Sequence, residues 1–131
     1  MKRLSLAFAA FSLTATQAYA GAIIDETCKI LHNRAALLDN LATDVANTAR
    51  KKSLEVQAQY KDNSEIRAKL LEIMETSTNQ IFSYQKELID IERESMTYAC
   101  PKAPTIEQFT RDEAILKAER EKFANEARFD R

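Results

Sequence analysis

The residues best suited to chemistry in this chain are its two cysteines, Cys28 and Cys100, and its single histidine, His32. Cys28 and His32 are four residues apart, so they would share one face of a helix, and Cys100 could join them as a third zinc ligand. A structural zinc site takes four ligands, and no fourth one stands at a suitable spacing. Two cysteines in an oxidising compartment more often form a disulfide. We therefore expect a Cys28–Cys100 disulfide, with no metal and no cofactor.

Signatures of catalysis are missing from the sequence. A single glycine leaves no nucleophile-elbow or phosphate-cradling pattern. Carboxylates such as Asp90 and Glu94 are spaced for one helix face, where such groups are usually solvated. The net charge of −1 gives no indication of binding to nucleic acid. We expect a protein that is not an enzyme and that has no nucleic-acid partner.

Residues 1–20 have the features of a secretory signal peptide in the expected order. Two basic residues near the start are followed by an apolar stretch over residues 4–13, and residues 18–20 (Ala-Tyr-Ala) form a small-x-small cleavage site. The apolar stretch is too short to span a bilayer. We expect cleavage between Ala20 and Gly21, a periplasmic or secreted location, and no integral membrane span in the mature chain.

The rest of the sequence has the composition of a long-helix protein, with 30% charged residues, 1 Gly and 2 Pro. From about residue 25 to about residue 60, apolar or small residues recur with the alternating spacing of a coiled-coil seam. A second such seam runs from about residue 65 to about residue 99. The members of the first seam are Ile24, Cys28, Leu31, Ala35, Leu38, Ala42, Val45, Ala49 and Val56. Those of the second are Ile66, Leu70, Ile73, Ser77, Ile81, Tyr84, Leu88, Ile91, Ser95 and Tyr98.

A turn at Asp62-Asn63-Ser64 separates the two expected helices. Asp62 and Glu65 have the spacing of a capping box, and Ser64 is an alternative cap. Pro101 ends the second helix, because proline cannot continue a helical hydrogen-bond ladder. The sequence therefore predicts two arms of similar length that fold back on each other.

The antiparallel register follows from two independent patterns. If facing residues have numbers with a constant sum of about 129, Leu31 meets Tyr98 and Leu38 meets Ile91 on the shared seam. The two cysteines satisfy almost the same sum, so they should lie within disulfide distance. Closing a loop of about 72 residues would add roughly 4 kcal/mol of stability in the chain-entropy account. We predict an all-α fold in which residues 21–103 form a coiled-coil-like antiparallel helical hairpin closed by a disulfide.

One layer of this predicted seam is polar. The register places Lys52 opposite Ser77, which lies in the polar run of residues 75–80, and it places Glu75 within reach of the lysine. Such layers commonly fix the register of a coiled coil at some cost in stability. The alternative interpretation is a notch that binds a polar ligand.

A third amphipathic helix is expected within residues 104–131. Thr105 and Gln108 have the spacing of a capping box, and the helix could continue to about Phe129. Its apolar stripe includes Phe109, Leu116 and Phe123.

Both arms of the hairpin carry apolar residues outside the seam, mostly near the cysteines, and we expect the third helix to pack there. The result would be a small three-helix bundle at the base, beyond which the tip of the hairpin projects. These residues are Ile30 and Leu37 on the first arm and Met74, Phe82, Ile89 and Met96 on the second. In the alternative interpretation the third helix is a mobile arm that docks onto a partner.

Without visible chemistry, we expect this protein to act by protein–protein binding. It would be an accessory subunit, inhibitor, immunity or exclusion factor in the bacterial envelope or a secretion system, and its partner would be another envelope or secreted protein. The predicted contact residues are Tyr60 and Leu71 near the tip and Phe109, Leu116 and Phe123 on the third helix.

Two other functions fit the same pattern. A periplasmic holdase chaperone would grip unfolded clients with the projecting arms, and it would need exposed apolar surface. A small-ligand carrier would need a cavity in the base of the bundle. A homodimer formed through the apolar residues outside the seam is compatible with the interaction protein and with the chaperone.

Overall fold

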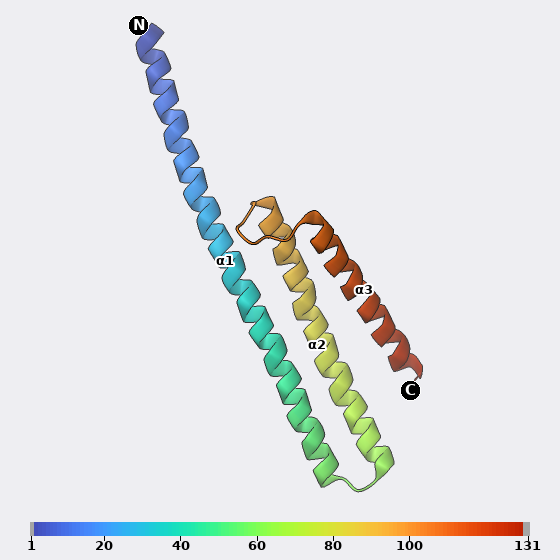
Figure 1. The fold of residues 1–131 in the computed structure, drawn as a ribbon. Coiled ribbons are helices and arrows are strands. Elements are labelled where there is room, and N and C mark those ends of the chain that lie inside the picture. The colour runs from blue at the N-terminus through green and yellow to red at the C-terminus, as the bar shows by residue number, and fades with distance from the viewer. Residues whose placement is uncertain (1, 130–131) are drawn as a thin grey trace.

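The computed structural model describes the backbone of residues 2–129 and the side chains of residues 20–128. Over the described residues the chain forms three helices, α1 (Lys2–Gln59), α2 (Asn63–Thr97) and α3 (Ile106–Phe129). α1 and α2 run antiparallel as the arms of a hairpin, and α3 folds back along α2 (Figure 1). The predicted hairpin with a shorter third helix is confirmed. The side chains of the expected signal peptide, up to residue 19, lie outside the described residues.

The turn at the tip is built by the predicted helix cap. Asp62 is the N-cap of α2, and its carboxylate accepts a hydrogen bond from the amide of Ser64 at 3.2 Å. The carbonyl of Asp62 accepts the first helical bond, from the amide of Ile66 at 3.0 Å. α2 begins at Asn63, directly after this cap, and so two residues before the expected start.

Cys28 and Cys100 form the predicted disulfide, with their Cα atoms 5.5 Å apart. Next to it, Leu31, Leu38 and Ile91 are the buried side chains of the described chain, and Cys100 packs against them. Arg34 and Glu87 form an ion pair across the same half of the hairpin. The disulfide and the joint burial of Leu38 and Ile91 agree with the register deduced from the seams.

Tyr98 differs from its predicted place on the seam, since its side chain is 42% exposed. α2 ends one residue earlier, at Thr97, and Tyr98 is its C-cap. Ala99 then adopts a left-handed backbone conformation with φ of 50°, which turns the chain away from the helix axis. Tyr98 is therefore less buried than its predicted seam position required.

α3 begins with the predicted capping box. The amide of Thr105 donates to Oε1 of Gln108 at 3.1 Å, and the amide of Gln108 donates to Oγ1 of Thr105 at 3.2 Å. The helix packs against α2, where the rings of Phe82 and Phe123 meet edge to face with centroids 5.9 Å apart. α3 is thus held on the hairpin by the apolar stripe that the sequence predicted.

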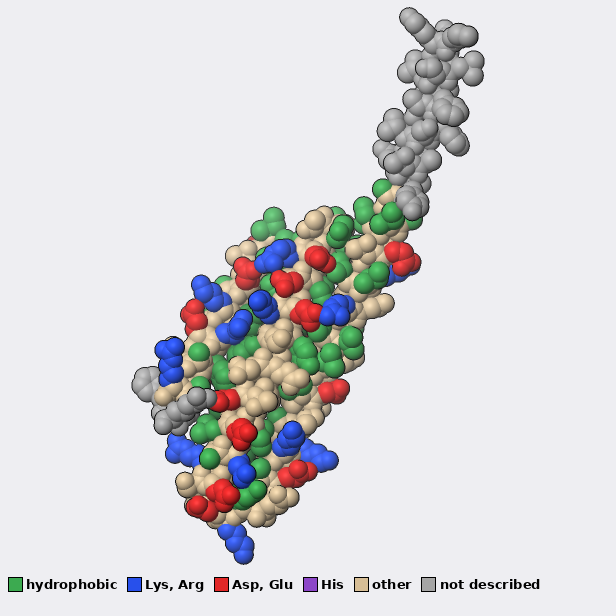
Figure 2. All heavy atoms as spheres, turned by 180° about the vertical axis from the view of Figure 1, so that it is seen from behind, with side chains coloured by type: hydrophobic (Ala, Val, Ile, Leu, Met, Phe, Trp, Pro, Cys, Tyr) green, Lys and Arg blue, Asp and Glu red, His purple; other side chains and the backbone are tan. Residues whose placement is uncertain are grey.

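Within the described residues, α3 makes its helix contacts with α2 and none with α1. Ile30 and Leu37, which we expected to support the third helix from the first arm, are 63% and 51% exposed. Hydrophobic side chains accordingly reach the surface between charged ones over much of the face shown in Figure 2. In the described part of the chain, no helix has a stretch long and apolar enough to cross a bilayer.

Candidate functional site

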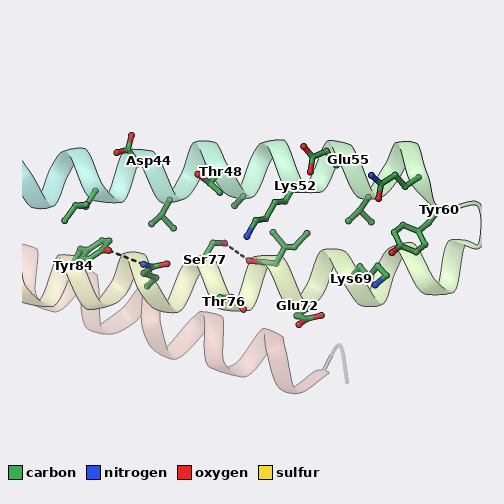
Figure 3. Close-up of a pocket in the computed structure, with 17 residues that line it drawn as sticks. Asp44, Thr48, Lys52, Glu55, Tyr60, Lys69, Glu72, Thr76, Ser77 and Tyr84 are labelled. Atoms are coloured by element: carbon green, nitrogen blue, oxygen red, sulfur yellow. Dashed lines mark hydrogen bonds between the residues drawn. The ribbon is translucent and has the colours of Figure 1, made fainter.

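A cleft of about 650 Å³ separates α1 from α2 in the half of the hairpin near the tip (Figure 3). It extends from the level of Leu41 and Tyr84 to the level of Tyr60 and Lys69. Its remaining lining residues are Asp44, Val45, Thr48, Ala49, Lys52, Glu55, Val56, Gln59, Glu72, Ile73, Thr76, Ser77 and Gln80.

The cleft lies where small or polar side chains interrupt the apolar seam. Ala49 and Ser77 occupy seam positions here, whereas Leu38 and Ile91 fill the same seam at the base. The hydroxyl of Ser77 donates to the carbonyl of Ile73 at 2.7 Å, so it is bonded within α2 and does not reach across. The arms are tied together by the turn at one end and the disulfide at the other, and small side chains between these ties leave a gap.

Lys52 extends from α1 into this gap towards α2, on the level of Ser77 (Figure 3). These two members of the predicted polar layer therefore share the cleft. Glu75 lies elsewhere, in a second groove between α2 and α3 that Arg120 and Arg128 also line. The layer is thus divided between the two sides of α2.

The cleft combines apolar side chains with charges of both signs. Leu41, Val45 and Ile73 are among its apolar members, and carboxylates and ammonium groups stand along its length. At the tip, the ammonium of Lys69 lies 4.7 Å from the centre of the Tyr60 ring, a cation–π contact that places both side chains at the mouth. Such a lining suits an amphipathic chain segment better than a uniformly apolar or uniformly charged one.

Of the residues predicted to contact a partner, Tyr60 lines the cleft and Leu71 is half-buried outside its lining. The three residues predicted on α3 are each half-buried, and two of them contact α2. Phe123 contacts Phe82, as described above. Phe109 lies under the guanidinium of Arg93, 5.3 Å from the centre of its ring.

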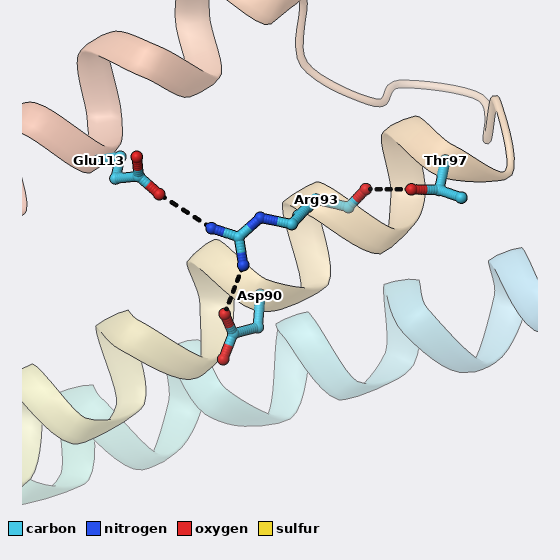
Figure 4. Close-up of polar contacts among 4 residues, drawn as sticks. All are labelled: Asp90, Arg93, Thr97 and Glu113. Atoms are coloured by element: carbon cyan, nitrogen blue, oxygen red, sulfur yellow. Dashed lines mark hydrogen bonds and ion pairs between the residues drawn. The ribbon is translucent and has the colours of Figure 1, made fainter.

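Arg93 also connects α2 to α3 through polar contacts (Figure 4). Its guanidinium donates to Glu113 on α3 at 2.9 Å and to Asp90 on its own helix at 3.1 Å. All three side chains are at least half exposed, so these ion pairs orient α3 more than they stabilise it.

Glu92 is the one described group with a clear electrostatic perturbation. Burial, together with the negative charge of Asp112 on α3, raises the pKa of its carboxyl above the ordinary value of 4.5. Its Oε2 atom is buried without a hydrogen-bond partner among the described residues. Glu92 is not among the residues that line the cleft, so this perturbation belongs to the packing of α3.

Sequence reasoning missed most of the cleft residues, among them Asp44, Thr48, Glu55, Lys69 and Glu72. The available signal was the polar layer at Lys52 and Ser77, which we interpreted as a device that fixes the register, with a notch for a polar ligand as the alternative. A ligand carrier would need a cavity in the base of the bundle, whereas the cleft lies in the half near the tip.

The described residues contain no cluster of three or more His, Cys, Asp or Glu side chains arranged to hold a metal ion. The zinc alternative needed two free thiols, and both are joined in the disulfide. No protein-family model, curated protein or solved structure matches this chain.

Proposed function

We propose that this protein is an exported interaction protein that binds a helical segment of another envelope or secreted protein between the arms of its hairpin. It has no catalytic role in this proposal. It would serve as an accessory subunit, an inhibitor, or an immunity or exclusion factor in the bacterial envelope or a secretion system.

The observation that supports this proposal is the open cleft between α1 and α2 near the tip. All of the buried side chains of the described chain lie in the other half of the hairpin, so the tip half has no core of its own. An amphipathic helix bound in the cleft would bury Val45, Val56 and Ile73. It would contact both arms of the hairpin at once. Binding would therefore complete the packing that the hairpin leaves open.

Export is supported by the sequence features at the start of the chain and by the disulfide. Residues 1–20 have the order of features of a signal peptide, and the structure describes no side chain before residue 20. A disulfide that closes a long loop persists in oxidising compartments such as the periplasm. Both features favour a protein that acts outside the cytoplasm.

Site-specific photo-crosslinking from the cleft tests the proposal. A photoreactive amino acid at Thr48, an exposed residue that lines the cleft, should give one discrete adduct with the partner in the cells that make the protein. The matched control is Asn47, which is exposed on the same helix but does not line the cleft. Adducts of equal yield from both positions, or none from Thr48, would count against binding in the cleft.

A holdase chaperone is the second candidate, and exposed apolar side chains favour it. Residues such as Leu54, Met74 and Ile115 are large, hydrophobic and more than 40% exposed. A holdase would give many adducts from Thr48 instead of one, and it would suppress the aggregation of an unrelated unfolded protein at a near-stoichiometric ratio. Failure to suppress aggregation, with a single adduct, favours the specific interaction protein.

A further inference from the structure

A stripe of exposed apolar side chains on α1 has no partner within the described chain. Ile23, Ile30 and Leu37 are 50%, 63% and 51% exposed, although each is a large hydrophobic residue. They are spaced by seven residues, so they lie on the same face of the helix. Among the described residues α3 makes no contact with α1, so it leaves this face uncovered. We call these three residues the α1 stripe.

The α1 stripe has the pattern of a seam between two helices. Seven-residue spacing keeps side chains in line when a second helix packs alongside. The stripe covers about 14 residues, or roughly 21 Å of helix. A contact of this length requires another helix that is apolar at matching intervals.

The charges beside the stripe are arranged symmetrically about Ile30. Glu26 stands four residues before it and Arg34 stands four residues after it. If a second α1 packs antiparallel with Ile30 against Ile30, Glu26 of each copy lies beside Arg34 of the other. In a parallel arrangement, Glu26 would face Glu26 and Arg34 would face Arg34, and like charges oppose such pairing.

The apolar residues obey the same symmetry. The antiparallel arrangement places Ile23 of one copy against Leu37 of the other, so all three members of the stripe find apolar partners. A surface that is complementary to itself about a central residue is what a two-fold dimer requires. We propose that a second copy of this chain covers the α1 stripe, in an antiparallel dimer with its two-fold axis at Ile30.

Glu26 and Arg34 are both accessible for this contact. Their side chains are 71% and 52% exposed. Arg34 already pairs with Glu87 on α2, and a guanidinium has enough donors to bind a second carboxylate at the same time. The stripe is shorter than a standard interface, so the dimer should be weak, with a dissociation constant of about micromolar or higher.

Cysteine cross-linking tests the position of the axis. In Ile30→Cys the two new thiols would meet across the two-fold axis, and mild oxidation should link the chains. Leu54→Cys is the matched control, because Leu54 is 61% exposed on the same helix and lies away from the stripe. We expect Ile30→Cys to form covalent dimer at least about tenfold faster than Leu54→Cys. The non-covalent dimer keeps the two thiols at position 30 close together and so raises their effective concentration. Equal rates would overturn the proposal.

A charge-reversal cycle tests the antiparallel register by sedimentation equilibrium. Glu26→Arg and Arg34→Glu should each weaken dimerisation about tenfold, since each breaks two symmetry-related pairs. The double variant restores opposite charges across the interface, and its dissociation constant should return to within about threefold of the wild-type value. Failure of the double variant to recover, or a wild-type chain that stays monomeric at millimolar concentration, would overturn the proposal.

The dimer and the cleft can fail independently. Ile30→Glu should abolish dimerisation but leave the adduct from Thr48 unchanged, because Ile30 is not among the residues that line the cleft. Retention of the dimer in Ile30→Glu would contradict the α1 stripe as the interface.

Discussion

The amide of Cys100 donates a hydrogen bond to the carbonyl of Ser95 at 2.9 Å, and this bond sets the path of the chain from α2 to the disulfide. A second bond joins the amide of Ala99 to the carbonyl of Met96 at 3.1 Å. Together they form a Schellman motif, which requires a left-handed residue at Ala99. The end of α2 is therefore what brings Cys100 to Cys28.

Ala99→Gly should stabilise the protein by about 1 kcal/mol, because glycine adopts the left-handed conformation without the steric cost that a Cβ atom imposes. Urea unfolding with the disulfide intact measures this change. Ala36→Gly is the control, since Ala36 is an exposed residue within α1, where glycine should cost about 0.5–1 kcal/mol. A loss of stability in Ala99→Gly would contradict the role assigned to the motif.

Removing the disulfide should lower the free energy of unfolding substantially. The double variant Cys28→Ser/Cys100→Ser should lose about 4 kcal/mol, because the unfolded chain regains the freedom of a long loop. Among the described residues only Leu31, Leu38 and Ile91 are buried, so the core contributes little stability that could offset the loss of the disulfide. Urea titration followed by circular dichroism checks it. Equal midpoints for the variant and the oxidised wild type would show that the hairpin does not depend on its closure.

Two neighbouring leucines on α1 should respond differently to truncation. Leu38 is 2% exposed within the core, so Leu38→Ala should cost roughly 2–3 kcal/mol. Leu37 is 51% exposed, so Leu37→Ala should cost less than about 0.5 kcal/mol when the protein is dilute enough to be monomeric. Thermal unfolding at low concentration compares the two. A larger effect at Leu37 would mean that the face of α1 turned towards α2 has been assigned incorrectly.

Glu92 should make stability depend on pH. Its pKa is raised in the folded protein, first by burial and then by Asp112, so the folded state binds this proton more tightly than the unfolded state does. The penalty for ionising Glu92 is therefore present at neutral pH. It is relieved as the pH falls through the raised pKa towards the ordinary value of 4.5.

The variant Glu92→Gln lacks this ionisation and isolates it from the other carboxylates. We expect Glu92→Gln to be more stable than the wild type at neutral pH, with the difference shrinking as the pH approaches 4.5. Urea midpoints of both proteins across this range provide the measurement. Asp90→Asn is a control on the same helix. The difference between its urea midpoint and that of the wild type should not shrink in this way as the pH approaches 4.5. A Glu92→Gln difference that stays constant with pH would contradict the environment described for Glu92.

The sequence predicted the parts of the fold that depend on local pattern. The cap at Asp62, the capping box of Thr105 and Gln108, and the seam that pairs Leu38 with Ile91 are all specified by spacing along the chain. The disulfide followed because its spacing agreed with the seam. These features involve neighbours in sequence or a single antiparallel register.

Other features depend on the volume that remains between packed side chains. The positions of residues along the sequence do not reveal that volume. The seam positions of Ala49 and Ser77 have the same periodicity as those of the base, yet their small side chains line an open cleft. We expected the third helix to pack on Ile30 and Leu37, which are exposed. An apolar stripe in a sequence does not show which helix will cover it. The exact end of α2 was not predicted because the left-handed residue that follows its cap is Ala99, whereas glycine is the usual sequence signal for such an end.

The most direct test of the proposed function fills the cleft and measures binding of the partner. Ala49 is half-buried and lines the cleft, so Ala49→Phe would place a ring where the partner's helix is expected to lie. Ala58→Phe is the control, because Ala58 is exposed on the same helix and does not line the cleft. We predict that the adduct formed from Thr48 disappears in Ala49→Phe and persists in Ala58→Phe, with both variants as stable as the parent. An adduct that survives in Ala49→Phe at full yield would contradict binding between the arms.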